Sequence, residues 1–95
     1  MSYKIAVLPG DGIGPEVMRE GIQVLQQVAR LYHFGIELEE GIVGGASIDA
    51  HGKPLTDSVL NLAKQSDAVM LGAMGGPKWD GLDYAIRPER ALLGL

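Results

Sequence analysis

The 95-residue sequence contains no cysteine, so it can form neither a disulfide framework nor a thiolate metal site. That absence is typical of proteins from a reducing compartment. Basic residues are also few, since 8 Lys and Arg face 12 Asp and Glu and leave a formal net charge of -4. The acidic balance argues against nucleic acid or an anionic membrane surface as the main partner, although it does not exclude a local anion site.

Long hydrophobic runs are absent as well. The amino-terminal stretch MSYKIAVLPGDG has four consecutive apolar residues, 5–8, before its first proline. Such a run is too short for a signal peptide or a membrane-spanning helix, so we expect a cytoplasmic protein. The two histidines, His33 and His51, have no further ligand at metal spacing, and no zinc site is predicted.

Glycine is abundant, since 14 of the 95 residues are glycine, about twice the usual share of about 7%. Between glycine-rich turns, the apolar periodicity predicts the order β-α-β-α-β. The predicted elements are a strand over 5–8 buried on both faces, a helix from Pro15 to His33, an edge or half-covered strand from 36 toward 43, a turn-rich loop over 49–54, a helix capped by Thr56 or Asp57, a buried strand over 67–71, and a last helix starting near Pro88. This alternation favours an α/β sheet with right-handed crossovers. Its apolar faces are too many for so short a chain to cover, so we expect it to be a fragment of a longer protein.

The first glycine cluster, LPGDGIGPEV over 8–17, follows the first strand directly. A dinucleotide fingerprint needs the spacing G-x-G-x-x-G, whereas Gly10, Gly12 and Gly14 are spaced G-x-G-x-G. Pro15 also removes one N–H that a helix start would offer to a phosphate. The pattern therefore favours a tight scaffold turn that shapes a cleft, with direct phosphate contact as the alternative.

The second glycine cluster, Gly72 to Gly81, follows the third strand, where open α/β sheets usually bind their ligands. It combines adjacent glycines with one cation, one large aromatic ring and one acid, at Lys78, Trp79 and Asp80. Its position favours a ligand loop. The alternative is a flexible surface loop that its tryptophan anchors to the core.

Other candidate residues have structural interpretations. Asp11, Asp49 and Asp67 are isolated in the sequence, and each can serve locally in a turn or a cap. No Ser-His-Asp set can be argued, and helical patterning makes the pair Leu92-Leu93 more typical of a core than of a specificity pocket.

Four stretches together resemble one enzyme family over essentially the whole chain. LPGDGIGPEV at 8–17, VGGASIDAHGKPL at 43–55, DAVMLGAMGGPKWDGL at 67–82 and RPERALLGL at 87–95 are similar to the amino-terminal part of the 3-isopropylmalate dehydrogenases. These belong with isocitrate and tartrate dehydrogenases to the β-decarboxylating dehydrogenases. The resemblance implies an α/β fold that is not a Rossmann fold. It also implies that residues 1–95 are the amino-terminal portion of the first, nucleotide-binding domain of a two-domain enzyme.

The resemblance implies an activity as well. Members oxidise (2R,3S)-3-isopropylmalate with NAD and decarboxylate it to 4-methyl-2-oxopentanoate, a step of leucine biosynthesis. They are homodimeric cytoplasmic enzymes that use Mg²⁺ or Mn²⁺. Related tartrate-type or homoisocitrate-type activities remain alternatives, as do a free-standing nucleotide- or anion-binding module and a structural subdomain that serves assembly.

The resemblance assigns site residues by position. The residues implied to line the NAD site are Gly75, Gly76, Pro77, Lys78, Trp79, Asp80 and Glu89. Glu89 is implied to lie near the nicotinamide and the substrate, and Leu92 and Leu93 to receive the substrate's isopropyl group. An apolar pair would leave the extra carboxylate of isocitrate unpaired, which costs several kcal/mol, so it separates the two substrates.

The catalytic residues are expected elsewhere. The family's substrate-binding arginines, its acid-base tyrosine and lysine, and its metal-binding aspartates match no residue of 1–95. We therefore expect no catalytic residue and no metal ligand in this chain, and no activity from it alone.

Overall fold

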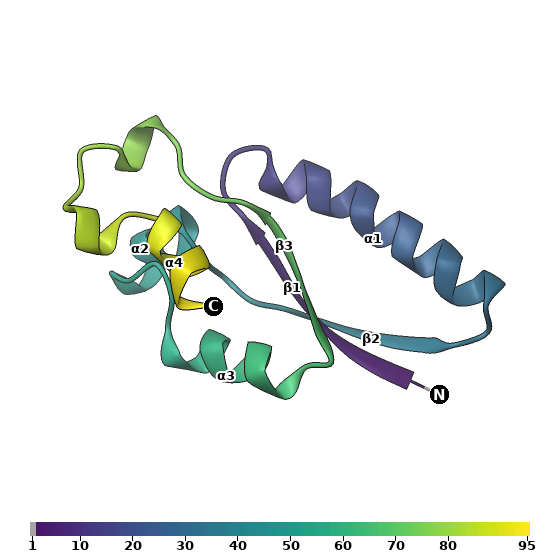
Figure 1. The fold of residues 1–95 in the computed structure, drawn as a ribbon. Helices are drawn as coiled ribbons and strands as arrows, with labels where there is room; N and C mark the ends of the chain where they lie inside the picture. The colour runs from purple at the N-terminus through teal and green to yellow at the C-terminus, as the bar shows by residue number, and fades with distance from the viewer. Residues whose placement is uncertain (1) are drawn as a thin grey trace.

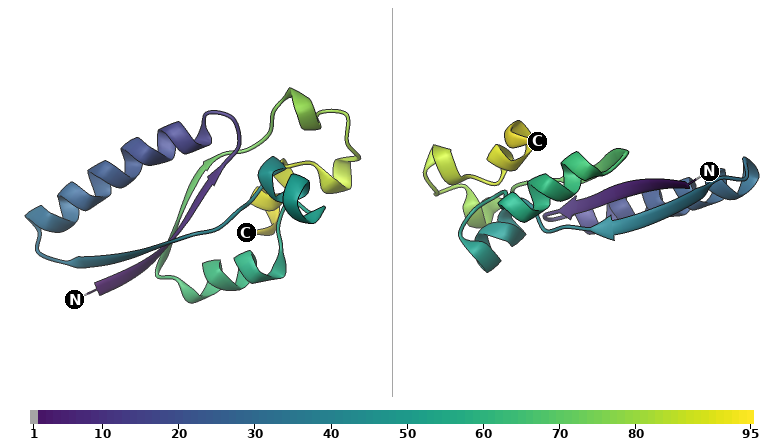
Figure 2. Two further views of the ribbon diagram at one scale, coloured as in Figure 1. Left: turned by 180° about the vertical axis from the view of Figure 1, so that it is seen from behind. Right: turned by 90° about the horizontal axis from the view of Figure 1, so that it is seen from below.

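The computed structural model describes residues 2–95 and contains a three-stranded parallel sheet with helices on both sides (Figures 1 and 2). The strand order is β2-β1-β3. Strand β1 (Ser2–Gly10) lies in the centre, between β2 (Gly35–Glu40) and β3 (Ala68–Ala73). The α/β class predicted from the sequence is confirmed.

The two outer strands differ in detail from their predictions. The central run 5–8 is buried, as predicted, because a strand pairs with each edge of β1 and helices cover both faces of the sheet. Strand β2 ends at Glu40, short of the predicted 43, and Gly41 N–H then donates to Val7 O at 2.9 Å. The prediction of a buried third strand is wrong for residues 2–95, because β3 is an edge strand whose Ala68 and Val69 are exposed.

Two helices cover opposite sides of the sheet (Figure 1). Helix α1 (Gly14–Leu31) lies on one side, with Met18 and Ala29 buried. Helix α3 (Asp57–Gln65) lies on the other side. The predicted cap is confirmed, since Thr56 Oγ1 accepts a hydrogen bond from Val59 N–H at 3.4 Å.

The remaining helices gather near the carboxyl ends of the strands. Helix α2 (Gly45–His51) was not predicted, and it overlaps the start of the loop expected over 49–54. Helix α4 (Glu89–Gly94) begins after Pro88, as predicted. Short 3₁₀ turns occupy Pro77–Trp79 (η1) and Tyr84–Ile86 (η2).

The core cluster joins β1 to α3 and α4. It consists of Leu8, Val43, Val59 and Ala91, with Leu55, Leu71 and Met74 packed against it. No helix within residues 2–95 is long and apolar enough to cross a membrane.

Candidate functional site

The segments that follow the three parallel strands meet at Asp11. Its Oδ2 accepts hydrogen bonds from Gly45 N–H at 2.6 Å and Gly75 N–H at 3.0 Å, and its Oδ1 accepts one from Ala46 N–H at 2.8 Å. The Asp11 backbone N–H donates to Ala73 O at 2.7 Å. One side chain, 4% exposed, therefore connects the β1–α1 turn to the start of α2 and to the segment after β3.

The stretch LPGDGIGPEV runs from the end of β1 into α1 and contains two glycines in the left-handed region, Gly10 at φ 80° and Gly12 at φ 59°. Gly14 N–H donates to Asp11 O at 2.8 Å, and α1 begins without a side-chain cap. The carboxylate held inside this turn is a negative group that accepts backbone donors from neighbouring segments. The geometry favours the scaffold interpretation of the turn over direct phosphate contact.

The second glycine cluster leaves β3 as an ordered loop. Gly75 has φ 98°, which favours glycine, and its N–H is the donor that Asp11 accepts. A Cβ added at Gly75 would lie 3.4 Å from the carboxyl carbon of Glu89. The structure thus brings together two of the predicted site residues that are fourteen positions apart, Gly75 and Glu89.

Lys78 and Trp79 point toward helix α2. Lys78 Nζ donates to Asp49 Oδ2 at 2.8 Å, and Trp79 Nε1 donates to Asp49 Oδ1 at 3.3 Å. A Cβ at Gly45 would overlap the Trp79 ring, so the ring lies directly against the start of α2. This packing matches the anchored-loop interpretation and ties the loop down beside Gly75 and Gly76.

The Lys78 contact also shifts a titration. The hydrogen bond from Lys78 lowers the pKa of Asp49 below its ordinary value, and the Trp79 hydrogen bond adds to the effect, while desolvation opposes it. Asp49 therefore keeps its negative charge in the folded chain to lower pH than a free aspartate does.

A cavity of about 210 Å³ lies beside the start of α4 and includes two of the predicted site residues. Its walls are Tyr84, Arg87, Glu89, Arg90 and Leu93. The guanidinium carbons of Arg87 and Arg90 stand 5.9 and 5.8 Å from the centre of the Tyr84 ring. A carboxylate, two cations, an aromatic ring and an apolar side chain therefore line one hollow, a combination typical of small-molecule sites.

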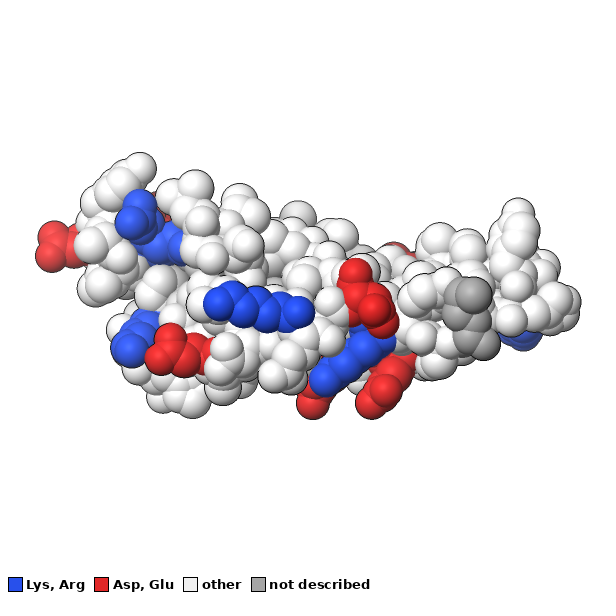
Figure 3. Space-filling model, turned by 60° about the horizontal axis from the view of Figure 1, so that its bottom comes forward, with Lys and Arg blue, Asp and Glu red and all other residues white. Residues whose placement is uncertain are grey.

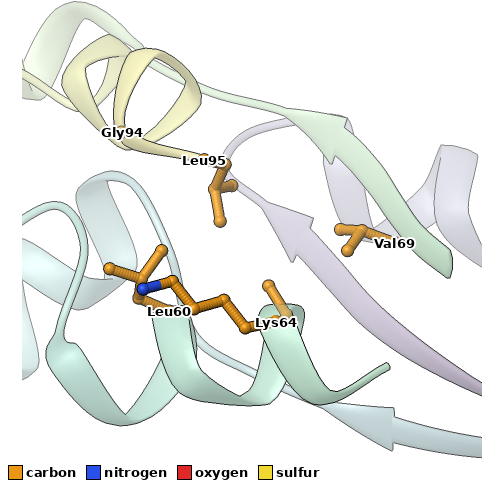
Figure 4. A pocket seen from close by; sticks show the side chains of 6 residues that line it. Leu60, Lys64, Val69, Gly94 and Leu95 are labelled. Atoms are coloured by element: carbon orange, nitrogen blue, oxygen red, sulfur yellow. The ribbon is translucent and has the colours of Figure 1, made fainter. Parts of the chain in front are cut away.

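The other predicted site residues lie at the surface. Leu92 and Leu93 are 56% and 68% exposed, so within residues 2–95 the pair is not part of a core. Pro77 and Asp80 are exposed at the two ends of the η1 turn. A wider cavity of about 380 Å³ opens between α3, β3 and the end of α4 (Figure 4).

Sequence reasoning missed the long-range roles of the three aspartates. Asp11 and Asp49 each bind segments about thirty or more positions away, and Asp67 Oδ2 accepts Lys4 N–H at 2.8 Å across 63 positions. The local turn and cap roles expected for them leave out these contacts. The only signal was that Asp11 and the pairs Gly44-Gly45 and Gly75-Gly76 follow strands predicted to be parallel.

Metal ligands do not gather in the described residues. No group of three or more His, Asp or Glu side chains within 2–95 could hold a metal ion.

The sequence and the fold are both similar to those of known proteins. Residues 4–95 match the family described as isocitrate/isopropylmalate dehydrogenase. This match extends over nearly the whole chain, and the chain belongs to that family.

Individual relatives give a narrower similarity. The chain is 56% identical over all 95 residues to 3-isopropylmalate dehydrogenase of Staphylococcus saprophyticus, covering 27% of that protein. It is 57% identical over 93 residues, 98% of the chain, to 3-isopropylmalate dehydrogenase of Gloeobacter violaceus, covering 26% of it. The chain therefore spans about a quarter of the length of these curated relatives.

Solved structures agree on the fold. A β-decarboxylating dehydrogenase from Thermococcus kodakarensis, solved in its apo form, matches 79% of the chain and 21% of its own length with a TM-score of 0.65 and 36% identity. Isocitrate dehydrogenase from Methylococcus capsulatus matches 86% of the chain and 22% of its own with a TM-score of 0.71 and 26% identity.

Proposed function

We propose that these residues form the amino-terminal portion of the first domain of a longer, two-domain 3-isopropylmalate dehydrogenase. That full-length protein oxidises (2R,3S)-3-isopropylmalate with NAD and decarboxylates it to 4-methyl-2-oxopentanoate, in leucine biosynthesis. The observation that carries the proposal is the identity of more than half over the whole chain to proteins of that name.

The geometry supports a dinucleotide site at the second glycine cluster. Gly75 and Gly76 carry no side chains of their own, while the Glu89 carboxylate lies beside Gly75 and the Trp79 ring lies beside Gly76. A planar ring can approach such backbone closely. NAD⁺ would supply the hydride acceptor, while Gly75, Gly76, Pro77, Lys78, Trp79, Asp80 and Glu89 are the residues we assign to hold and orient it.

The substrate side rests on Glu89, Leu92 and Leu93. The two leucines are exposed on α4, and Leu93 lines the cavity that contains Glu89, so they can meet a ligand rather than fill a core. Desolvating an isopropyl group against these leucines costs little, whereas desolvating the third carboxylate of isocitrate there costs several kcal/mol. Tartrate-type and homoisocitrate-type substrates differ less sharply at this position.

Mg²⁺ or Mn²⁺ would be held by the remainder of the full-length protein. The described residues lack a ligand set that fits the ion. The acid-base pair is assigned to that remainder as well, which leaves these 95 residues without activity of their own. We further propose a cytoplasmic homodimer.

The second candidate is a free-standing nucleotide-binding module without catalysis. The ordered loop at Gly75, already fixed by Asp11 within this chain, favours it. Affinity for NAD separates the two proposals, because a module would bind NAD without the rest of the enzyme.

The pocket assignment is tested in the full-length protein with Leu92→Ser combined with Leu93→Asn. We expect kcat/KM for 3-isopropylmalate to fall at least tenfold, because the apolar contact to the isopropyl group is lost, with KM for NAD unchanged. Steady-state NADH formation measures both.

The control is Tyr32→Asn, a large side chain just after α1 that is 74% exposed. It should leave both constants as in the wild type. An unchanged kcat/KM in the double variant would remove Leu92 and Leu93 from the site.

A further inference from the structure

We infer that Asp11 is a positioning residue for the dinucleotide site, because its buried carboxylate holds Gly75 in place before the cofactor arrives. The inference rests on the proposed function, since it takes the loop after β3 as the NAD loop. It concerns a residue of the first glycine cluster, which the sequence pattern assigned to a scaffold turn.

Both oxygens of Asp11 are occupied by backbone donors from two separate segments. Oδ2 accepts from Gly45 and Gly75 at 2.6 and 3.0 Å, and Oδ1 accepts from Ala46 at 2.8 Å. These three N–H groups compensate the negative charge of Asp11, a residue that is 4% exposed. Hydrogen bonds to a charged acceptor are about twice as strong as neutral ones, so this connection is stiff.

Only a carboxylate satisfies all three donors. An amide of the same shape has a single acceptor oxygen, and its NH₂ group would face at least one of the backbone N–H groups. Asp11→Asn therefore weakens the connection while nearly preserving the volume of the side chain.

The connection acts on the proposed cofactor loop at its most constrained point. Gly75 is at φ 98° and lies next to the Glu89 carboxylate, with 3.4 Å between a built Cβ and the carboxyl carbon. The Asp11–Gly75 hydrogen bond thus fixes the glycine relative to Glu89. Because Asp11 is itself buried, it acts through Gly75 and does not touch the ligand.

The test is Asp11→Asn in the full-length protein, with steady-state kinetics in NAD and in 3-isopropylmalate. We expect KM for NAD to rise about tenfold, as for the loss of one charge-assisted hydrogen bond, with a smaller change in kcat. A merely structural role would instead lower the melting temperature and the active fraction, leaving KM for NAD unchanged.

The matched control is Asp67→Asn. Asp67 also accepts a backbone N–H, from Lys4 at 2.8 Å, but beside the opening residues of β1 and β3, at the other end of the sheet from Gly75. This variant should keep the wild-type KM for NAD. An Asp11→Asn protein with the wild-type KM for NAD, or an Asp67→Asn protein with the same rise, would overturn the inference.

Failure of the proposed function gives a different result, since the wild-type protein would then show no NAD-dependent oxidation. A second measurement needs no variant: amide hydrogen exchange of the NAD-free wild type. We expect Gly75 N–H to be protected to the same order as Gly45 N–H. Free exchange at Gly75 that slows only when NAD is added would overturn the inference even if Asp11→Asn fails to fold.

Discussion

Asp49 links helix α2 to the second glycine cluster through two hydrogen bonds. Lys78 Nζ and Trp79 Nε1 donate to its two oxygens, and the hydrogen bond from Lys78 is the main cause of its lowered pKa. A carboxyl whose pKa is lower in the folded state stabilises the fold above its unfolded pKa. That stability is lost as the pH falls through the folded pKa.

Lys78→Met is expected to raise the pKa of Asp49 toward the ordinary value of about 3.9, because the principal donor to the carboxylate is removed. A titration followed by the carboxyl carbon resonance of Asp49 measures this. Lys64→Met, which removes a lysine on α3 instead, should leave the Asp49 midpoint where it is. Equal midpoints in wild type and Lys78→Met would contradict the ion pair.

Ser47 is the second single-residue case, because its hydroxyl is fully buried in α2 without a hydrogen-bond partner among the described residues. Ser47→Ala is expected to raise the free energy of unfolding by about 1 kcal/mol, since a desolvated and unpaired hydroxyl is removed from a helix. Denaturant unfolding of the full-length protein measures the change. Ser58→Ala, at an exposed position of α3, should give no gain, and a destabilised Ser47→Ala would show that the hydroxyl has a partner.

Between elements, glycine allows backbone segments to approach closely where β1, β3 and α1 meet. A Cβ at Gly10 would overlap Ala73 O, and a Cβ at Gly14 or Gly72 would overlap Pro9 O. These contacts explain why glycines stand at the carboxyl ends of β1 and β3. At Gly72 the requirement for glycine is steric alone, because its φ is not in the left-handed region.

Gly72→Ala is expected to lower the free energy of unfolding by about 1–3 kcal/mol, since backbone must move to admit one methyl group. The matched control is Gly81→Ala, where a Cβ would meet nothing within 4 Å and φ is not left-handed. Chemical denaturation of both variants measures the two free energies of unfolding. Equal stabilities would contradict the close approach of Gly72 to Pro9.

The elements that the sequence predicted well are those with a strong local signal. The apolar run 5–8, the periodic helix from Pro15 and the cap at Thr56 are each dictated by neighbouring residues. Helix α2 was missed because Gly44-Gly45 indicates a break, whereas Gly44 at φ 71° serves as the N-cap residue. Its seven residues are too few to display a periodicity, and Asp11 supplies acceptors for its first N–H groups from 34 and 35 positions away.

For the candidate site too, local signals could be predicted from the sequence and long-range contacts could not. The sequence placed the candidate site after the third strand, because ligands of open α/β sheets gather at the carboxyl ends of the strands, and this location stays a prediction. The pairing of Lys78 with Asp49 and of Gly75 with Asp11 was not predictable, since each joins residues that are far apart in the sequence. Such pairings depend on how the segments pack in three dimensions.

The molecule as a whole is elongated, with extents of 46 × 24 × 19 Å, and much apolar surface remains exposed. One stripe runs along α1 and contains Val17, Val24, Val28 and Leu31. Figure 3 shows large uncharged stretches on one face, with blue and red groups interspersed and no continuous basic patch. Exposed apolar stretches of this kind mark surfaces that another part of a protein or a partner covers.

The 95 residues alone are therefore expected to bind NAD weakly or not at all, with a dissociation constant at least a hundredfold above that of the full-length protein. The rest of the enzyme would supply the missing contacts to NAD. Each tenfold change in the dissociation constant corresponds to about 1.4 kcal/mol of binding free energy. Isothermal calorimetry on the two proteins measures the difference. A low-micromolar constant for the isolated chain would favour the binding-module proposal.

One ratio tests whether the full-length protein is an NAD-dependent dehydrogenase whose Leu92-Leu93 pair selects an alkyl-branched malate. The measurement is kcat/KM for 3-isopropylmalate divided by kcat/KM for isocitrate, with NAD and Mg²⁺ present. We expect a ratio above about 100, because burying an unpaired carboxylate costs several kcal/mol. A ratio near or below one would contradict the selection of 3-isopropylmalate by Leu92 and Leu93.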